Sequence, residues 1–209
     1  SPYHVGKQND RESMIHTRAT DNGVYFAYLN AVGGQDELVF DGASNVFDPK
    51  GKLIARGSEF EEDIVVVDLE IDGVAPSRIQ EPRLHKEVGP IIGDSGKGRI
   101  IHISKHVIKQ RPVLEKGTLS ESIDGSEEVY KALVTGTRDY VRKSGFQKVI
   151  IGLSGGIDSA LTTCVASDAL GPKNVVVVSM PSRYSSDGSL VDAELLSKNL
   201  GVELWTIPI

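Results

Sequence analysis

Two continuous apolar runs, separated by one helix-length segment, constrain the fold of this 209-residue chain more than any other feature. The first run covers residues 149–153 and the second covers residues 175–178. Helical patterns at 159–170 and at about 189–200 follow them, and a last strand covers 203–207. Strands that are apolar without alternation are typical of parallel sheets between helices, so we expect a parallel sheet covered on both faces.

A helix is predicted to precede this sheet, from Ser126 to Lys143. Acidic side chains in its first turn and basic side chains in its last turn suit the helix dipole. Two rows at helical spacing predict the buried stripe: Val129, Leu133 and Tyr140 in one row, and Tyr130, Val134 and Val141 in the other.

The first third of the chain has a different pattern. Residues 9–22 predict a helix that Asn9 or Asp10 caps and that Asn22-Gly23 ends. Short strands joined by tight turns then predict a mostly antiparallel sheet, in which Gly33-Gly34 breaks the first strand. These strands are expected at 24–29, 38–40, 44–47, 52–55 and 64–69.

Residues 73–125 lack any sustained period and are punctuated by proline and glycine, so they predict an irregular connector. The expected organisation is therefore a first domain part at 1–72, a connector at 73–125 and a second domain part at 126–209. The chain opens without an initiator methionine and closes on an apolar run. We therefore interpret it as an internal portion of a longer protein.

Composition narrows the class of protein. The chain is 39% hydrophobic and has a net charge of −6, which favours a globular domain and argues against nucleic-acid binding. No apolar run is long enough for a membrane span. The single cysteine, Cys164, excludes an internal disulfide and favours a reducing, cytoplasmic location. Its place within a helical pattern predicts a small buried side chain and not a nucleophile.

The strongest local signal is a glycine-rich turn between the first apolar strand and the next helix. Glycines let a backbone approach an anion closely, and N–H groups at a helix N-terminus add donors. Asp158 can hold Mg²⁺ beside a polyphosphate. The turn lacks the lysine of a Walker A loop and the spacing of a dinucleotide fingerprint, although a plain capped turn remains an alternative. The residues concerned are Gly152, Leu153, Ser154, Gly155, Gly156, Ile157, Asp158 and Ser159.

This Ser-Gly-Gly-x-Asp-Ser pattern resembles the loop of the ATP pyrophosphatases, which split ATP to AMP and pyrophosphate. Together with residues 179–186, Leu200-Gly201 and 207–209, it resembles the synthetase domain of the glutamine-dependent NAD(+) synthetase family. The resemblance implies that backbone near Met180 meets adenine and that Arg183 faces phosphate. The alternative for Arg183 is a solvated loop cation.

Residues 27–44 resemble the later part of a nitrilase-type amidase domain, which in that family hydrolyses glutamine to release ammonia. The resemblance implies that Ser1 and Lys7 bind glutamine. The family's catalytic Cys, Glu and Lys fall outside this chain, so no catalytic residue is assigned. Gln35, Asp36 and Glu37 are interpreted as a turn. The five histidines share no metal-ligand spacing; they are His4, His16, His85, His102 and His106.

The fold implied combines α/β and α+β classes: the C-terminal part of a nitrilase-like α-β-β-α domain joined to the start of a Rossmann-like parallel-sheet ATP pyrophosphatase domain. The implied reaction is that of a carbon-nitrogen ligase, in which ATP and Mg²⁺ support amidation of deamido-NAD by ammonia from glutamine. A homo-oligomer is also implied, with no nucleic acid or membrane as partner. The alternatives are a GMP-synthetase-like ligase, a tRNA-thiolating enzyme, or a nucleotide-binding piece without chemistry. We expect little or no activity from the 209 residues alone.

Overall fold

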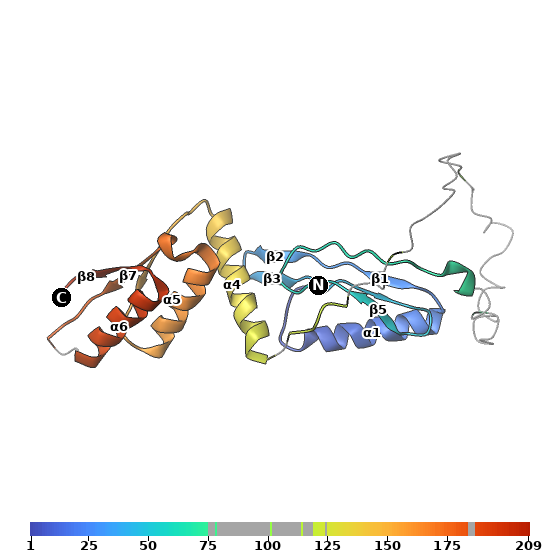
Figure 1. Cartoon of the computed structure of the whole chain (residues 1–209), viewed down its shortest axis with the longest axis horizontal. Coiled ribbons are helices and arrows are strands. Elements are labelled where there is room, and N and C mark those ends of the chain that lie inside the picture. Colours follow the sequence, from blue (N-terminus) through green and yellow to red (C-terminus); the bar gives the residue numbers. More distant parts are fainter. Residues whose placement is uncertain (75–77, 79–100, 102–113, 115–118, 124, 184–186) are drawn as a thin grey trace.

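The structure, a computed structural model, describes residues 1–74, 78, 101, 114, 119–123, 125–183 and 187–209. These residues form two units that lie end to end, and helix α4 (Gly125–Lys143) crosses between them (Figure 1). The N-terminal unit contains antiparallel strands, and the C-terminal unit contains parallel strands. Within the described ranges, no helix is long and apolar enough to cross a membrane.

Helix α1 (Lys7–Asn22) begins earlier than the sequence predicts, because Gly6 occupies the N-cap with a φ of 76° and no side chain caps the helix. Asn9 and Asp10 are therefore not caps. The predicted end is confirmed, since Gly23 terminates α1 in the left-handed conformation. Ile15 and Ala19 are fully buried on the inner face of the helix.

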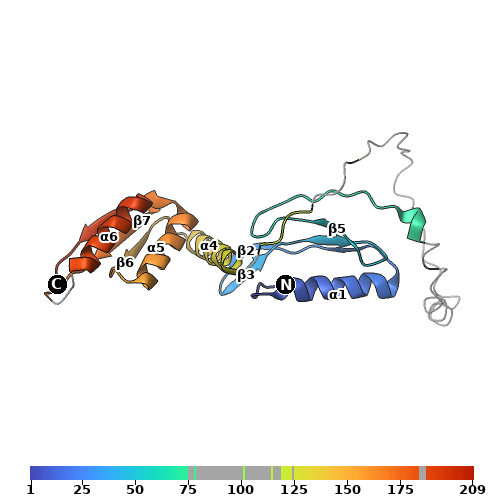
Figure 2. The ribbon, with the colours of Figure 1, turned by 60° about the horizontal axis from the view of Figure 1, so that its bottom comes forward.

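Helix α1 packs against a three-stranded antiparallel sheet, in which β4 (Asn45–Phe47) lies between β1 (Phe26–Tyr28) and β5 (Leu53–Arg56) (Figure 2). Phe47 contacts the buried face of α1 from the central strand. The predicted strand at 64–69 is wrong, because this segment pairs with no described strand. Ile64 is 87% exposed there, and a 3-10 helix, η1 (Ile71–Gly73), follows.

A separate hairpin, β2 (Val32–Gln35) and β3 (Leu38–Asp41), extends from the N-terminal unit toward α4 (Figure 1). The sequence predicts that Gly33-Gly34 interrupts a strand, and this is wrong: both glycines pair within β2. The predicted turn is confirmed for Asp36 and Glu37, with Asp36 at a φ of 52°, while Gln35 ends β2.

Helix α4 begins and ends close to its predicted limits, but its buried face differs from the prediction. Val129, Leu133 and Tyr140 are 38%, 47% and 61% exposed, so the first predicted row is not buried. The second row is partly correct, since Val141 is buried and Val134 packs beside it. The helix instead turns a second set of side chains inward: Glu128, Ala132 and Thr135.

The C-terminal unit is a parallel sheet with β7 (Val175–Ser179) between β6 (Val149–Gly152) and β8 (Glu203–Thr206). Helix α5 (Ile157–Leu170), the 3-10 helix η3 (Pro172–Asn174) and helix α6 (Asp187–Leu200) connect the strands. These bounds agree with the predicted order of strand, helix, strand, helix and strand.

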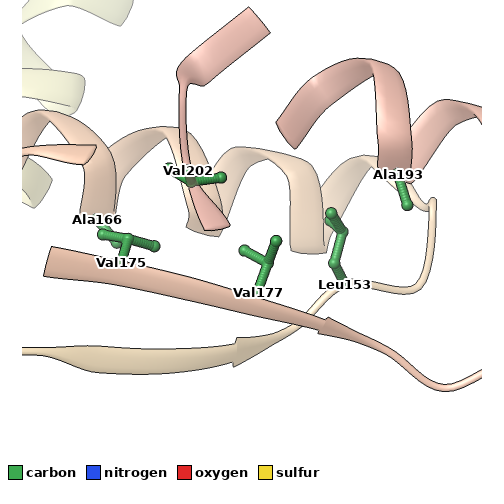
Figure 3. Packing of buried hydrophobic residues seen from close by; sticks show 6 residues of the cluster. All are labelled: Leu153, Ala166, Val175, Val177, Ala193 and Val202. Carbon is green, nitrogen blue, oxygen red and sulfur yellow. The ribbon is translucent and has the colours of Figure 1, made fainter. Parts of the chain in front are cut away.

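The helices of this unit cover only one face of the sheet in the described chain. Ala166 of α5 and Ala193 of α6 belong to one buried cluster with Val175 and Val177, on the same face of the sheet (Figure 3). The sequence predicts cover on both faces. The difference arises because the strand order never reverses, and right-handed crossovers in one direction place successive helices on the same side.

Candidate functional site

The glycine-rich loop (residues 152–159) leaves the carboxyl end of β6 and enters α5, which is the predicted setting. Leu153 anchors it: its side chain is 2% exposed, and its N–H donates to the carbonyl of Val178 at 2.9 Å. Gly155 has a φ of 79°, and a Cβ there would lie 2.5 Å from the carbonyl oxygen of Ser189. Only glycine fits at this position, because both the backbone conformation and the adjacent α6 exclude a side chain.

Hydrogen bonds between Ser154 and Ser159 join the two sides of the glycine-rich loop. Their hydroxyl oxygens lie 3.1 Å apart, and the N–H of Ser154 donates to the Ser159 hydroxyl at 3.3 Å. The Gly156 N–H donates to the Ser154 hydroxyl, also at 3.3 Å. Both hydroxyls are therefore at the N-terminus of α5, whose N-cap, Gly156, supplies no side-chain hydrogen bond. Hydroxyls and helix-terminal N–H groups are the kinds of donor that can bind an anion.

The remaining predicted residues lie around the carboxyl edge of the sheet. Met180, directly after β7, is 52% exposed, and its Cε would lie 3.6 Å from a Cβ built on Gly152. Met180 and the loop serine Ser154 share the lining of a cavity of about 110 Å³. Asp158 and Arg183 are exposed side chains on the same unit.

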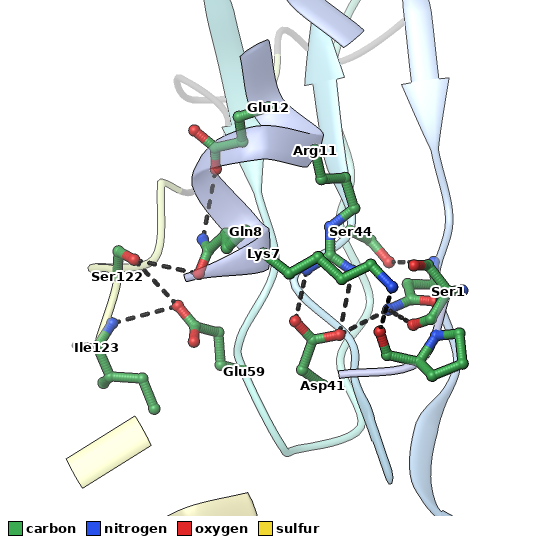
Figure 4. A network of polar contacts seen from close by, with 12 residues as sticks. Ser1, Lys7, Gln8, Arg11, Glu12, Asp41, Ser44, Glu59, Ser122 and Ile123 are labelled. Carbon is green, nitrogen blue, oxygen red and sulfur yellow. Dashed lines mark hydrogen bonds and ion pairs between the residues drawn. The ribbon is translucent and has the colours of Figure 1, made fainter. Parts of the chain in front are cut away.

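The second predicted site contains Ser1 and Lys7, which flank the start of α1 (Figure 4). The Lys7 ammonium donates to the carbonyl of Pro2 at 2.9 Å, and the Ser1 carbonyl accepts from the Asn30 amide at 3.3 Å. The Lys7 side chain therefore folds back onto the residue that follows Ser1. We call residues 1–7 the N-terminal segment.

A buried ion pair that the sequence analysis missed lies beneath this segment. Arg11 and Asp41 have side chains that are each 4% exposed, and the two side chains make paired hydrogen bonds at 3.1 and 2.5 Å. Asn30 donates to the same carboxylate at 2.8 Å. Burial works to lower the pKa of Arg11, but the hydrogen bonds and charges of Asp41 and Tyr28 together outweigh burial and raise that pKa. The sequence signal for this buried arginine was its spacing: Arg11 precedes the buried Ile15 by four residues and so lies on the same face of α1.

A second missed network attaches the residues before α4 to α1. One carboxylate oxygen of Glu59 accepts from the Ser122 hydroxyl and from the Ile123 N–H, both at 3.2 Å (Figure 4). Ser122 also lies 3.2 Å from the amide oxygen of Gln8. Burial raises the pKa of Glu59 despite these two hydrogen bonds. The C-terminal end of the predicted connector is therefore part of the N-terminal unit.

Tyr3 of the N-terminal segment lies in the same region. Burial, followed by the nearby Glu128 carboxylate, raises the pKa of Tyr3 to about 12. Its ring meets Phe60 edge to face, with the ring centroids 5.4 Å apart. Glu128 belongs to the first turn of α4, so α4 begins beside the predicted glutamine site.

The cysteine and the histidines that the sequence analysis considered are the remaining residues to place. Cys164 is half-buried and not fully buried, because α5 turns Thr163, Val165 and Ala166 inward. Among the described residues, no group of three or more potential ligands could hold a metal ion. His16 contacts the carbonyl of Gly51 at 2.6 Å. His85, His102 and His106 lie outside the described residues.

The two units match two family models. Residues 3–79 match carbon-nitrogen hydrolases, and residues 129–209 match NAD synthases. The chain thus joins part of an amide-hydrolysing type of domain to part of an NAD synthase domain. Over its whole length it is 46% identical to the glutamine-dependent NAD(+) synthetases of Aquifex aeolicus and Thermotoga maritima. Along all of its residues the chain is therefore similar to part of the glutamine-dependent NAD(+) synthetases.

The coverage of these relatives is partial: the chain spans 36% of the Aquifex aeolicus protein and 35% of the Thermotoga maritima protein. Among solved structures, it resembles the glutamine-dependent NAD+ synthetase from Acinetobacter baumannii in complex with adenosine diphosphate. That match has a TM-score of 0.72 and 34% identity, and it covers all of this chain and 32% of the other. The predicted fold class, a nitrilase-like part joined to a parallel-sheet part, is confirmed.

Proposed function

We propose that the protein of which this chain forms about a third amidates deamido-NAD to NAD, using ATP and the ammonia released from glutamine. AMP, pyrophosphate and glutamate are the other products. The observation that supports this most directly is the glycine-rich loop at the carboxyl end of β6, in a chain whose other unit matches carbon-nitrogen hydrolases. Similarity along the whole of this chain to part of the glutamine-dependent NAD(+) synthetases supports the pairing of the two activities.

The glycine-rich loop is the proposed polyphosphate site. Gly155 lets the loop pass close to Ser189 of α6, and Ser154 and Ser159 place hydroxyls at the N-terminus of α5. Donors that are already oriented stabilise the charge that develops as the α–β phosphoanhydride bond breaks. A similar protein from Acinetobacter baumannii was solved with adenosine diphosphate, which supports nucleotide binding as part of the proposal. Met180 and Arg183 are proposed contacts for adenine and phosphate.

Asp158 is the proposed residue that holds Mg²⁺. Its exposed carboxylate stands in the first turn of α5 next to the loop hydroxyls. Mg²⁺ is usually held by one or two carboxylates together with substrate phosphates, and the Asp158 carboxylate can supply one of these ligands. The ion would neutralise phosphate charge.

Ser1 and Lys7 are the proposed glutamine contacts. The N-terminal segment is rigidly supported, because the Tyr3 N–H donates to the Val39 carbonyl at 2.7 Å and the Arg11–Asp41 pair lies beneath it. A lysine ammonium suits the α-carboxylate of glutamine. The nucleophilic cysteine that would attack the amide is expected outside this chain. A cytoplasmic homo-oligomer is likewise part of the proposal.

The test is ammonia-dependent formation of NAD by the complete protein that carries this chain. Asp158→Ala is expected to lower kcat/KM at least about 100-fold, as for the loss of one strong transition-state contact. Glu194→Ala, which removes an exposed carboxylate from α6, is the matched control and should leave the rate unchanged. Full activity of Asp158→Ala would remove Asp158 from the mechanism. Turnover of XMP in place of deamido-NAD would favour the GMP-synthetase-like alternative.

A further inference from the structure

The hairpin β2–β3 and helix α4 meet at a junction that neither predicted site includes. The N–H of Gly34 donates to the Asp139 carboxylate at 2.8 Å, and the Gly34 carbonyl accepts from the Lys143 ammonium at 2.5 Å. Both backbone polar groups of one residue in β2 are therefore satisfied by side chains that follow it by more than 100 residues.

Two glycines let the strand and the helix touch at this junction. A Cβ built on Gly34 would lie 3.1 Å from the Cα of Gly136, and one built on Gly136 would lie 3.1 Å from a methyl group of Val39. A Cβ at Gly34 would force its neighbours to move by a few tenths of an ångström, and the nearest of them is a backbone atom of α4. The close approach explains why β2 contains consecutive glycines, and it makes the junction stiff.

One side of the junction leads to the predicted glutamine site. Val39 of β3 is the strand partner of Gly34, and its carbonyl accepts the N–H of Tyr3 from the N-terminal segment at 2.7 Å. Two residues further along β3, Asp41 makes the buried pair with Arg11. A shift of the hairpin would therefore move the backbone that holds the N-terminal segment.

The other side leads to the glycine-rich loop. Val141 of α4 is buried with Ala169 and Leu170 of α5, and the Tyr130 hydroxyl donates to the Asp168 carboxylate at 2.7 Å. Helix α5 starts at the end of the glycine-rich loop. Because packed helices move as rigid bodies, a displacement of the loop is transmitted to α4 along the length of α5.

Asp139 is ionised at the junction. Burial works to raise its pKa, but hydrogen bonds from Arg138 and Gly34 and the charges of Arg138 and Lys143 outweigh burial and lower the pKa. The carboxylate is 17% exposed, so solvent screens these interactions only in part. A charged acceptor strengthens its bond to the Gly34 N–H relative to a neutral one.

We propose that Asp139 is a positioning residue that couples the glutamine site to the ATP site by clamping Gly34 of β2 onto α4. This inference rests on the proposed function, since it assigns a link between the two sites described there. The link is a continuous set of contacts from the N-terminal segment through Val39 and Gly34 to α4 and α5. Asp139 touches no substrate in it.

The test compares two nitrogen sources in the complete protein. Asp139→Ala should lower glutamine-dependent NAD formation at least about fivefold, the lower end of typical coupling between sites. It should leave ammonia-dependent NAD formation unchanged and raise the ratio of glutamate released to NAD formed. Asp139→Asn keeps an oxygen acceptor for the Gly34 N–H and should restore most of the coupling, which a purely structural defect would not predict.

Arg142→Ala is the matched control, since it removes an exposed charge from the same turn of α4. It should leave both rates unchanged. Equal losses with ammonia and glutamine in Asp139→Ala, or no loss with glutamine, would overturn the coupling. A wild-type protein that forms no NAD from ammonia would instead refute the proposed function.

Hydrogen exchange gives a readout that does not depend on turnover. Addition of Mg-ATP to the wild-type protein should slow exchange both at residues 152–159 and at the hairpin, residues 32–41. In Asp139→Ala the change at the hairpin should vanish while that at the loop remains. Protection of the loop without any change at the wild-type hairpin would overturn the coupling and leave the proposed ATP site intact.

Discussion

The two units of this chain achieve burial by different means. The N-terminal unit places polar groups in its interior, among them Arg11, Asp41 and Glu59. In residues 149–183 and 187–209 of the C-terminal unit, the buried polar side chains are hydroxyls without charge, and apolar side chains around Val177 form the core. The comparison teaches that stability depends on charge and hydrogen bonding beside the predicted glutamine site, and on apolar packing beneath the predicted ATP site.

The largest expected effect comes from breaking the buried ion pair. Asp41→Ala should destabilise the N-terminal unit by about 3–5 kcal/mol, because it leaves the Arg11 charge buried without its partner. Urea unfolding followed by circular dichroism measures the loss, and hydrogen exchange locates it to α1. Asp21→Ala removes an exposed charge from α1, the helix that carries Arg11, and should change little. A loss below about 1 kcal/mol in Asp41→Ala would contradict the comparison.

Truncation of the apolar core should give the next largest effect. Leu153→Ala should cost about 2–3 kcal/mol, the lower end for such changes, because Leu153 borders cavities into which its surroundings can relax. The loss should stay constant from about pH 5 to pH 8, since no titrating group is involved. Leu195→Ala, at a side chain that is 55% exposed, is the control. A strong pH dependence of the Leu153→Ala effect would contradict the claim that apolar packing, and not charge, stabilises the C-terminal unit.

The smallest effect concerns Glu59 and depends on pH. Glu59→Ala should cost about 1–3 kcal/mol, because the Ser122 hydroxyl and the Ile123 N–H lose their acceptor. Glu59→Gln keeps an acceptor and removes a buried charge, so it should be neutral or stabilising at pH 7.

The sign of the pH dependence follows from the raised pKa of Glu59. The folded protein binds this proton more tightly than the unfolded chain, so the wild type gains stability as the pH falls through the folded pKa toward the unfolded value. The advantage of Glu59→Gln should therefore shrink on acidification in parallel denaturation series. An advantage that grows instead would show that the Glu59 pKa is not raised.

The parts of the fold that sequence predicts well are those determined by nearby residues. The glycine-rich loop, both strands beside it and the end of α1 at Gly23 depend on neighbours within a few positions, and all are confirmed. The loop's role as a nucleotide site remains a prediction.

The failures share a different cause, which is distance along the chain. Gly33 and Gly34 pair with β3 as a strand, and Gly34 lies against α4, which follows it by about 100 residues. The buried face of α4 includes Glu128 for the same reason, since its partner Tyr3 is far away in sequence. The segment 64–69 has a strand-like composition but no described strand to pair with.

The one-sided arrangement of α5 and α6 has a spectroscopic consequence. In the sheet register Trp205 pairs with Val178, and so it lies on the face opposite the helices. It is the only tryptophan in the sequence and is 44% exposed. Its emission therefore reports on that face alone: any chain segment or neighbouring molecule that comes to rest on it should shift the fluorescence to shorter wavelength, without an introduced dye.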